Sequence, residues 1–467
     1  MAGLKRRDIL LGATGLGAAA LAGPLRGVAN ATPKPDFKLQ SQMTSYAFGD
    51  RPLTDGLFST VAGGPPPVIR LKQNVEATLR LENGLKDHTT MHWHGIRLPN
   101  EMDGVPYLTQ MPVATGKTFD YTFTPPDAGT QWYHPHCATM QQMANGLTGF
   151  LIVDEAEDQG FDADIAINLK DFRIGEDGSL RPFFTPRGAS RGGTLGNVIT
   201  ANWREASVQE APSGGLARVR ILNSDVTRIH RLALPNLPGR IIAWDGQPVD
   251  EDIPWPTREE PLLLGPGQRL DVVFRMPDDE GVDTFIESRI SGSYRTIDTI
   301  RTVGGSSLKR NIAVVRPLPR NPIAEPVLAE AETREMIFGW SPGGEGSNNG
   351  LCGTYGFTFW SIDRNPWPGD AVEGVGPVAV LEQGKSYVLR LRNESPNAHP
   401  IHLHGLVFKP IRSDQRRLPA NYTDTLLLLK GETVDIALRA DNPGNWAFHC
   451  HIIEHQKTGL SGYIQVV

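Results

Sequence analysis

The stretch of sequence that decides the fold lies near the C-terminus and reads NWAFHCHIIEH, residues 445–455. Side chains alternate between the two faces of an extended strand. His449 and His451 would therefore share one face, and Cys450 would point to the opposite face. His455 lies far enough along for the chain to turn back toward the cysteine side. This strand would serve two metal environments that are joined covalently through Cys450.

The other histidines weigh against the alternative, a structural zinc ion, which takes four ligands in one tetrahedral cluster. Ten of the twelve histidines fall into four short motifs: His92/His94, His134/His136, His399/His402/His404 and His449/His451/His455. Strand parity separates eight of them as one set: His92, His94, His134, His136, His402, His404, His449 and His451. His399 has the opposite parity and joins Cys450 and His455 in a second set. The two histidines outside the motifs, His88 and His230, are interpreted as structural.

Metal chemistry distinguishes the two sets. Two imidazoles and one thiolate, with a weak or absent fourth ligand, are the ligand composition of a blue-copper electron-transfer site. Eight imidazoles are too many for one ion, but they suit a cluster of about three copper ions with positions open for oxygen.

An internal repeat connects the two ends of the chain. The segment LRLEN at residues 79–83 precedes the first H-x-H pair, and LRLRN at residues 389–393 precedes the pair at 402–404 with the same spacing. A fainter copy begins at residues 218–223 and carries no H-x-H pair. Alternating strands recur and long helical periodicity is scarce, so we expect an all-β chain of three consecutive β-sandwiches. The middle one is expected to hold no metal.

The composition is that of a globular protein, and the length is enough for about three domains. Hydrophobic residues make up 39% of the 467 residues, and the formal net charge is −6, which disfavours nucleic acid as a partner. Residues 1–31 have the features of an export signal: Lys5-Arg6-Arg7, a small-residue apolar run and an A-x-A cleavage site ending at Ala31. The paired arginines resemble a twin-arginine signal, with an ordinary secretory signal or an uncleaved anchor as the alternatives. We expect a periplasmic or secreted monomer with no membrane span after cleavage.

These motifs together resemble a three-domain multicopper oxidase of the bacterial laccase type, over nearly all of the mature chain. The resemblance implies three cupredoxin-like Greek-key β-sandwich domains, at residues 40–156, 160–316 and 325–467, and four copper ions. It implies that the type 1 copper is held by His399, Cys450 and His455, and the type 2 copper by His92 and His402. The two type 3 coppers would be held by His94, His134 and His451, and by His136, His404 and His449.

The resemblance further implies one-electron oxidation of a reductant at the type 1 copper and four-electron reduction of O2 to water at the trinuclear cluster. Cys450 is bonded through the backbone to His449 and His451, which gives electrons a short covalent path. Asp103 matches the family's acidic residue beside the cluster, with an ordinary turn aspartate as the alternative. Gln456 stands where some bacterial relatives place a second acidic residue, which leaves the second proton donor open. Glu454 is a neighbour but not a matched replacement.

Two further positions bear on redox chemistry. Leu460 occupies the place of an axial methionine in many relatives; it cannot coordinate, so a raised type 1 potential is expected. Cys137 and Cys352 remain as a possible disulfide, which suits an exported protein.

The expected reductants are phenols or aromatic amines, and Glu394 is a candidate for orienting them. The nine methionines are scattered, with none beyond Met336, which disfavours but does not remove oxidation of Cu(I). Oxidation of Mn(II) is a further alternative. A structural periplasmic protein of the same fold is the alternative of another class.

Overall fold

The computed structural model describes residues 34–235, 238–304, 308–343, 350–353, 355–369 and 374–467, so the expected export signal lies outside the described residues. Strands dominate these residues, and the helices are short: α1 (Thr139–Ala144), α2 (Pro186–Ala189), α3 (Ile453–Gln456) and the 3-10 turns η1 (Asn100–Met102), η2 (Ile312–Val314) and η3 (Leu328–Glu330). None of the helices in the described ranges has the length and apolar character needed to cross a membrane. The expectation of an all-β chain is confirmed.

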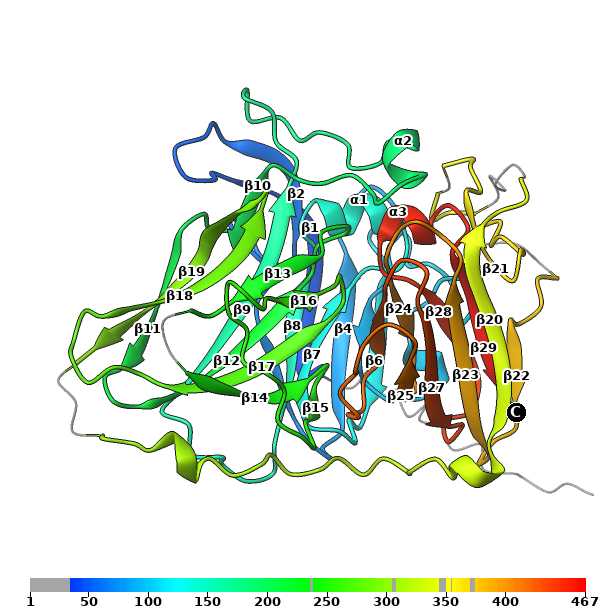
Figure 1. The fold of residues 1–467 in the computed structure, drawn as a ribbon. Helices are drawn as coiled ribbons and strands as arrows, with labels where there is room; N and C mark the ends of the chain where they lie inside the picture. Colours follow the sequence, from blue (N-terminus) through cyan, green and yellow to red (C-terminus); the bar gives the residue numbers. More distant parts are fainter. Residues whose placement is uncertain (1–33, 236–237, 305–307, 344–349, 354, 370–373) are drawn as a thin grey trace, which may run out of the picture. The chain divides into compact units, whose positions relative to one another are not determined.

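The strands before residue 155 form two four-stranded sheets, with the orders β2-β1-β4-β6 and β3-β8-β7-β5. Their bounds are β1 (Phe37–Tyr46), β2 (Thr54–Ser59), β3 (Ile69–Lys72), β4 (Ala77–Asn83), β5 (His92–His94), β6 (Thr118–Phe123), β7 (Gly129–His134) and β8 (Gly149–Asp154) (Figure 1).

The next strands form a six-stranded sheet, β10-β9-β12-β17-β14-β15, and a five-stranded sheet, β11-β19-β18-β13-β16. Their bounds are β9 (Ala163–Phe172), β10 (Val198–Ala201), β11 (Ser207–Pro212), β12 (Leu216–Asn223), β13 (His230–Ala233), β14 (Gly239–Trp244), β15 (Gln247–Pro248), β16 (Leu262–Leu264), β17 (Arg269–Arg275), β18 (Asp283–Ile290) and β19 (Ser293–Val303).

The last strands form two five-stranded sheets, β21-β20-β23-β27-β25 and β22-β29-β28-β24-β26. Their bounds are β20 (Glu332–Trp340), β21 (Trp360–Ile362), β22 (Ala379–Leu381), β23 (Ser386–Asn393), β24 (His399–Leu403), β25 (Lys409–Ser413), β26 (Thr425–Leu428), β27 (Thr433–Arg439), β28 (Gly444–Cys450) and β29 (Ser461–Val466).

The three pairs of sheets repeat one arrangement. In each, a long first strand pairs in parallel with a second strand, which pairs antiparallel with a third: β1-β4-β6, β9-β12-β17 and β20-β23-β27. The second strands of these sets, β4, β12 and β23, carry the segments from which the sequence repeat was recognised. β4 shows the burial pattern of a strand with one face in the core, with alternate residues from Ala77 to Asn83 buried. The predicted succession of three related β-sandwiches is thereby confirmed.

Strand pairing brings the histidine motifs together. β5 pairs with β7, so that His92 lies opposite His134. β24 and β28 run side by side in antiparallel pairing (Figure 1), which places His402 opposite His449 and Ile401 opposite Cys450. Alternation along β28 then sends the side chains of residues 449 and 450 to opposite faces of its sheet.

Candidate metal centre

His399, Cys450 and His455 come together at one buried point. This set is called the thiolate group, after the form that the Cys450 sulfur takes when it binds a metal ion. Sγ of Cys450 lies 3.6 Å from Nδ1 of His399 and 3.7 Å from Nδ1 of His455, and the two Nδ1 atoms are 3.1 Å apart. All three side chains are inaccessible to solvent. His455 reaches this point because the short helix α3 turns the chain back after β28. Two imidazole nitrogens and one sulfur thus converge where a single ion could bind all three.

Backbone hydrogen bonds tie Leu460 to this group. Leu460 is fully buried, and the backbone around it is fixed by two hydrogen bonds: Cys450 N–H donates to the Leu460 carbonyl (3.0 Å) and Leu460 N–H to the His455 carbonyl (2.9 Å). Burial raises the pKa of the Cys450 thiol and lowers the pKa of His455 to about 3. Both imidazoles are therefore neutral at neutral pH, as metal ligands must be.

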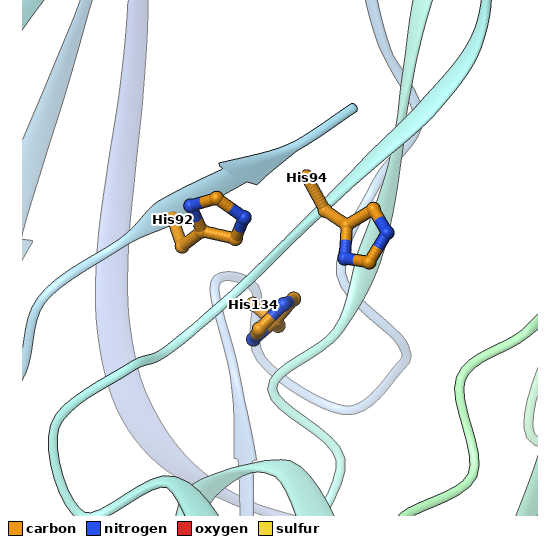
Figure 2. A group of neighbouring side chains, drawn as sticks. All are labelled: His92, His94 and His134. Carbon is orange, nitrogen blue, oxygen red and sulfur yellow. The ribbon is translucent and has the colours of Figure 1, made fainter. Parts of the chain in front are cut away.

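The eight other histidines gather in a second buried cluster. Figure 2 shows how His92 and His94 on β5 and His134 on β7 lie around one space; their ring nitrogens fall within 4.8 Å of one another. His136, His404 and His449 form a second such group, and His92, His402 and His404 a third. The ring of His451 lies 5.2 Å from that of His94 and 5.3 Å from that of His134.

Hydrogen bonding inside the cluster leaves some ring nitrogens without a proton, and these could bind metal ions. Nδ1 of His404 lies 2.9 Å from a carboxylate oxygen of Asp103, and Nδ1 of His449 lies 3.0 Å from the Cys450 carbonyl. Burial lowers the pKa of both imidazoles well below the usual value, so each carries one proton, and these acceptors place it on Nδ1. The two Nε2 atoms, 3.0 Å apart, then face each other as bare lone pairs. A cation between them would satisfy both.

All six of the other cluster histidines also hold a buried nitrogen without a protein partner: Nε2 of His92, His134 and His402, Nδ1 of His94 and His136, and both nitrogens of His451. Buried polar atoms normally have partners. Imidazole is a common ligand of copper ions, so these unpaired nitrogens fit a metal cluster. In His136 the nitrogen nearest the cluster is Nε2, 3.4 Å from Nε2 of His449.

Asp103 links two histidines of the cluster. Its backbone carbonyl lies 2.9 Å from Nδ1 of His92, and its two carboxylate oxygens lie 3.1 Å and 2.9 Å from Nδ1 of His92 and His404. The carboxylate is fully buried at the C-terminal end of η1. The sequence placed Asp103 beside the cluster, and the structure shows in addition that it orients both rings.

A second buried carboxylate, Asp424, was missed by the sequence analysis. Its Oδ1 lies 2.9 Å from Nε2 of His94, which is why this ring presents Nδ1 to the cluster while its neighbour His92 presents Nε2. Its backbone carbonyl lies 2.9 Å from Nδ1 of His402. No motif surrounds Asp424 in the sequence, so only the fold reveals its position.

Arg269 holds Asp424 in place. Its guanidinium donates to both carboxylate oxygens, at 2.8 Å and 2.6 Å, and also to the Gln131 side chain and the Asp245 carbonyl. Arg269 is fully buried on β17, and its partners include Gln131 on β7 and Asp424, the residue before β26, so it connects segments of all three pairs of sheets. No motif in the sequence singles out Arg269.

A segment of the middle region covers the thiolate group. Nε2 of His455 lies 2.6 Å from the Arg191 carbonyl, and the indole N–H of Trp360 donates to the Ala189 carbonyl at 2.6 Å. The buried Glu454 carboxylate accepts hydrogen bonds from Thr185 and Thr194 at the two ends of this segment. The Glu454 carboxylate therefore fixes residues 185–194, the covering segment, over the thiolate group.

The remaining sequence candidates are placed as follows. The side-chain nitrogen of Gln456 lies 3.4 Å from Nε2 of His136, at the edge of the cluster. Cys137 and Cys352 form a disulfide, so Cys450 is the one free cysteine of the three. Glu394 is half-exposed and paired with Arg392 at 2.9 Å. His230 is bonded to Ser288 and Asp225, in keeping with a structural role.

Comparison with known proteins shows the family of the chain. Two models of the multicopper oxidase family match residues 58–158 and 354–467. A crystal structure of a multi-copper oxidase from Pseudomonas thermotolerans superimposes with a TM-score of 0.83 and 36% identity, covering 92% of this chain and 98% of that one.

Two curated relatives are multicopper oxidase MmcO of Mycobacterium tuberculosis (29% identical; 85% of this chain, 80% of that protein) and laccase-1 of Botryotinia fuckeliana (27%; 85% and 76%). The chain belongs to the multicopper oxidase family. It is a laccase-like, copper-dependent oxidoreductase that uses O2 as electron acceptor.

Proposed function

We propose that the chain binds four copper ions and oxidises phenols or aromatic amines. His399, Cys450 and His455 would hold the type 1 copper, and His92 and His402 the type 2 copper. His94, His134 and His451 would hold one type 3 copper, and His136, His404 and His449 the other. The observation that carries the proposal is the pair of buried donor sets at the end of β28, one containing Cys450 and the other His449, with the His451 ring beside those of His94 and His134.

The bound ions would supply one-electron oxidation of the reductant and four-electron reduction of O2 to water. Cys450 supplies the connection between the sets, because its backbone is continuous with His449 and His451. Asp103 orients His92 and His404 and would be a carboxylate through which a proton reaches the cluster. Asp424, equally close to His94, is instead held by Arg269. Asp424 fixes which nitrogen His94 presents. Leu460 keeps a donor atom away from the thiolate group, which favours a raised potential.

We also propose the domain limits and the location. Residues 40–156, 160–316 and 325–467 would form the three domains, with copper ligands in the first and third. The twin-arginine-like segment in residues 1–31 would direct the chain out of the cytoplasm, and the disulfide between Cys137 and Cys352 is consistent with an oxidising compartment. The mature chain would act as a monomer.

The test is oxygen uptake by the copper-loaded protein with three reductants offered separately: 2,6-dimethoxyphenol, Cu(I) and Mn(II). We expect uptake with the phenol. Uptake with Cu(I) or Mn(II) but not with the phenol would assign the enzyme to metal-ion oxidation. His92→Ala with His402→Ala should abolish uptake while leaving the thiolate-to-copper absorption band, since neither residue contacts Cys450.

A further inference from the structure

Two stacked tryptophans connect the thiolate group with solvent. The rings of Trp340 and Trp360 lie with centroids 4.3 Å apart and planes 15° apart. Trp360 is fully buried, with its ring 4.6 Å from that of His455 and 5.1 Å from that of His399. Trp340, at the end of β20, is 46% exposed. Aromatic contacts are therefore continuous from the solvent to both imidazoles of the group.

The imidazoles themselves offer no free edge to a reductant. Nε2 of His455 is bonded to the Arg191 carbonyl at 2.6 Å, and Nε2 of His399 to the Ser395 hydroxyl at 2.7 Å. Both rings are inaccessible to solvent. A reductant bound at the protein surface therefore cannot touch either ring while the covering segment is in place.

The exposed ring itself suits a phenol. The indole of Trp340 offers a large flat face, and aromatic rings stack on such faces favourably. Glu394 does not share this face of the sheet: a methyl group placed on Gly339 would lie 3.7 Å from Cβ of Glu394, and residues 339 and 340 point to opposite faces of β20.

We propose that Trp340 is the surface on which aromatic reductants dock, and that the Trp340–Trp360 pair is the path by which their electrons reach the His399–Cys450–His455 group. This inference rests on the proposed function. In each step one phenol loses one electron and releases its hydroxyl proton to water, leaving a phenoxyl radical. The electron reduces one oxidised copper ion at the group. Both tryptophans end in their starting state.

The first test measures electron entry alone. The copper-loaded protein is mixed without oxygen with 2,6-dimethoxyphenol, and the bleaching rate of the thiolate-to-copper band is followed by stopped flow. Loss of stacking between the phenol and Trp340 alone predicts a slowing of about two- to tenfold. Trp340→Ala also removes the ring contact with Trp360, so bleaching should slow by about tenfold or more. Trp340→Phe, which keeps a ring, should restore a large part of the rate.

Phe357 supplies the matched control. It is also an exposed aromatic, at 40%, but its ring stacks on Phe359, with centroids 5.2 Å apart, and not on Trp360. Phe357→Ala should leave the bleaching rate unchanged. Equal slowing by the two alanine variants would show a general effect of the aromatic surface and would overturn the assignment to Trp340.

The second test needs no bound metal. Binding of 2-methoxynaphthalene, an aromatic ether with no hydroxyl proton, is measured on the metal-free protein by saturation-transfer NMR. Trp340→Ala should lose most of the transfer and Phe357→Ala should keep it; transfer that survives in Trp340→Ala would overturn docking at this ring.

The failures of the two proposals are distinguishable. A wild-type protein without the thiolate-to-copper band contradicts the proposed function. A wild-type protein with the band, whose bleaching rate is the same in Trp340→Ala, contradicts only the electron-entry path. The potential of the thiolate group should be equal in wild type and Trp340→Ala, because Trp340 does not contact His399, Cys450 or His455.

Discussion

Nε2 of His404 and Nε2 of His449 face each other at 3.0 Å. Their protons are placed on Nδ1 by Asp103 and by the Cys450 carbonyl. Two lone pairs at this distance repel each other in the absence of a cation. The facing pair of Nε2 atoms therefore destabilises the folded chain without metal. Binding of a metal ion removes this repulsion and stabilises the fold.

The metal-free protein should lose stability as the pH falls below about 6.5. Burial lowers the pKa of His455 to about 3 and lowers the pKa of the cluster histidines His136 and His404 well below the usual value. The unfolded chain therefore binds protons first, and unfolding becomes easier by up to about 1.4 kcal/mol per pH unit for each such histidine. Urea unfolding of the metal-free protein between about pH 8 and pH 5 measures the slope.

Two variants give this slope a control. His455→Ala removes one buried imidazole, so the slope should decrease by the equivalent of about one proton. His88→Ala should leave it unchanged, because His88 is half-buried and lies outside both histidine groups. Stability that is independent of pH in this range would contradict the neutral, buried state of the histidines.

Asp103→Asn should lower turnover by about 10- to 100-fold, as expected when a residue that orients metal ligands is changed. One carboxylate oxygen accepts from Nδ1 of His404, and the other lies 3.1 Å from Nδ1 of His92, which itself bonds to the Asp103 backbone carbonyl. An amide would turn an N–H toward one of the two rings. Oxygen uptake should fall, while anaerobic bleaching of the thiolate-to-copper band should not change. The control is Asp87→Asn on the exposed surface; full turnover by Asp103→Asn would refute the role.

Arg269→Ala should destabilise the protein by about 3–5 kcal/mol, since it leaves the buried Asp424 carboxylate without its partner. Arg269→Lys should recover only part of this loss, because a lysine cannot form two parallel hydrogen bonds with a carboxylate. The midpoint of urea unfolding reports both effects. Arg301→Ala, which breaks the exposed ion pair with Asp283, should leave the midpoint nearly unchanged. An equal shift in the two alanine variants would show that the buried contact of Arg269 with Asp424 has no special role in stability.

Leu460→Met should lower the potential of the thiolate group. A thioether next to Sγ would add a weak donor that favours the oxidised ion, whereas the buried leucine offers none. A spectroelectrochemical titration of the thiolate-to-copper band measures the potential. Leu438→Met, in the core on β27, controls for the added methionine. An unchanged potential in Leu460→Met would contradict the proposal that residue 460 sets the potential of the thiolate group.

The sequence was sufficient for the features that depend on local periodicity. Parity along a strand separated Cys450 from His449 and His451, and the repeated segments at 79–83 and 389–393 lie on the equivalent strands β4 and β23. Such features are visible because the strand period of two acts on neighbouring residues.

The features that the sequence analysis missed depend on contacts between distant segments. Asp424 reaches His94 across 330 positions, and the Arg191 carbonyl covers His455 across 264 positions. Neither segment has a recognisable composition, because one carboxylate or one backbone carbonyl is enough when the fold places it correctly. The stacking of Trp340 on Trp360 likewise follows from the pairing of β20 with β21.

The most direct test of the central claim is a count of copper ions in the wild-type protein and in Cys450→Ser, with the visible spectrum of each. The account predicts four ions and an intense thiolate-to-copper band in the wild type. It predicts three ions and no such band in Cys450→Ser, because the eight-histidine cluster does not use the sulfur. A single ion in the wild type, or loss of all copper in Cys450→Ser, would contradict two separate metal environments joined at Cys450.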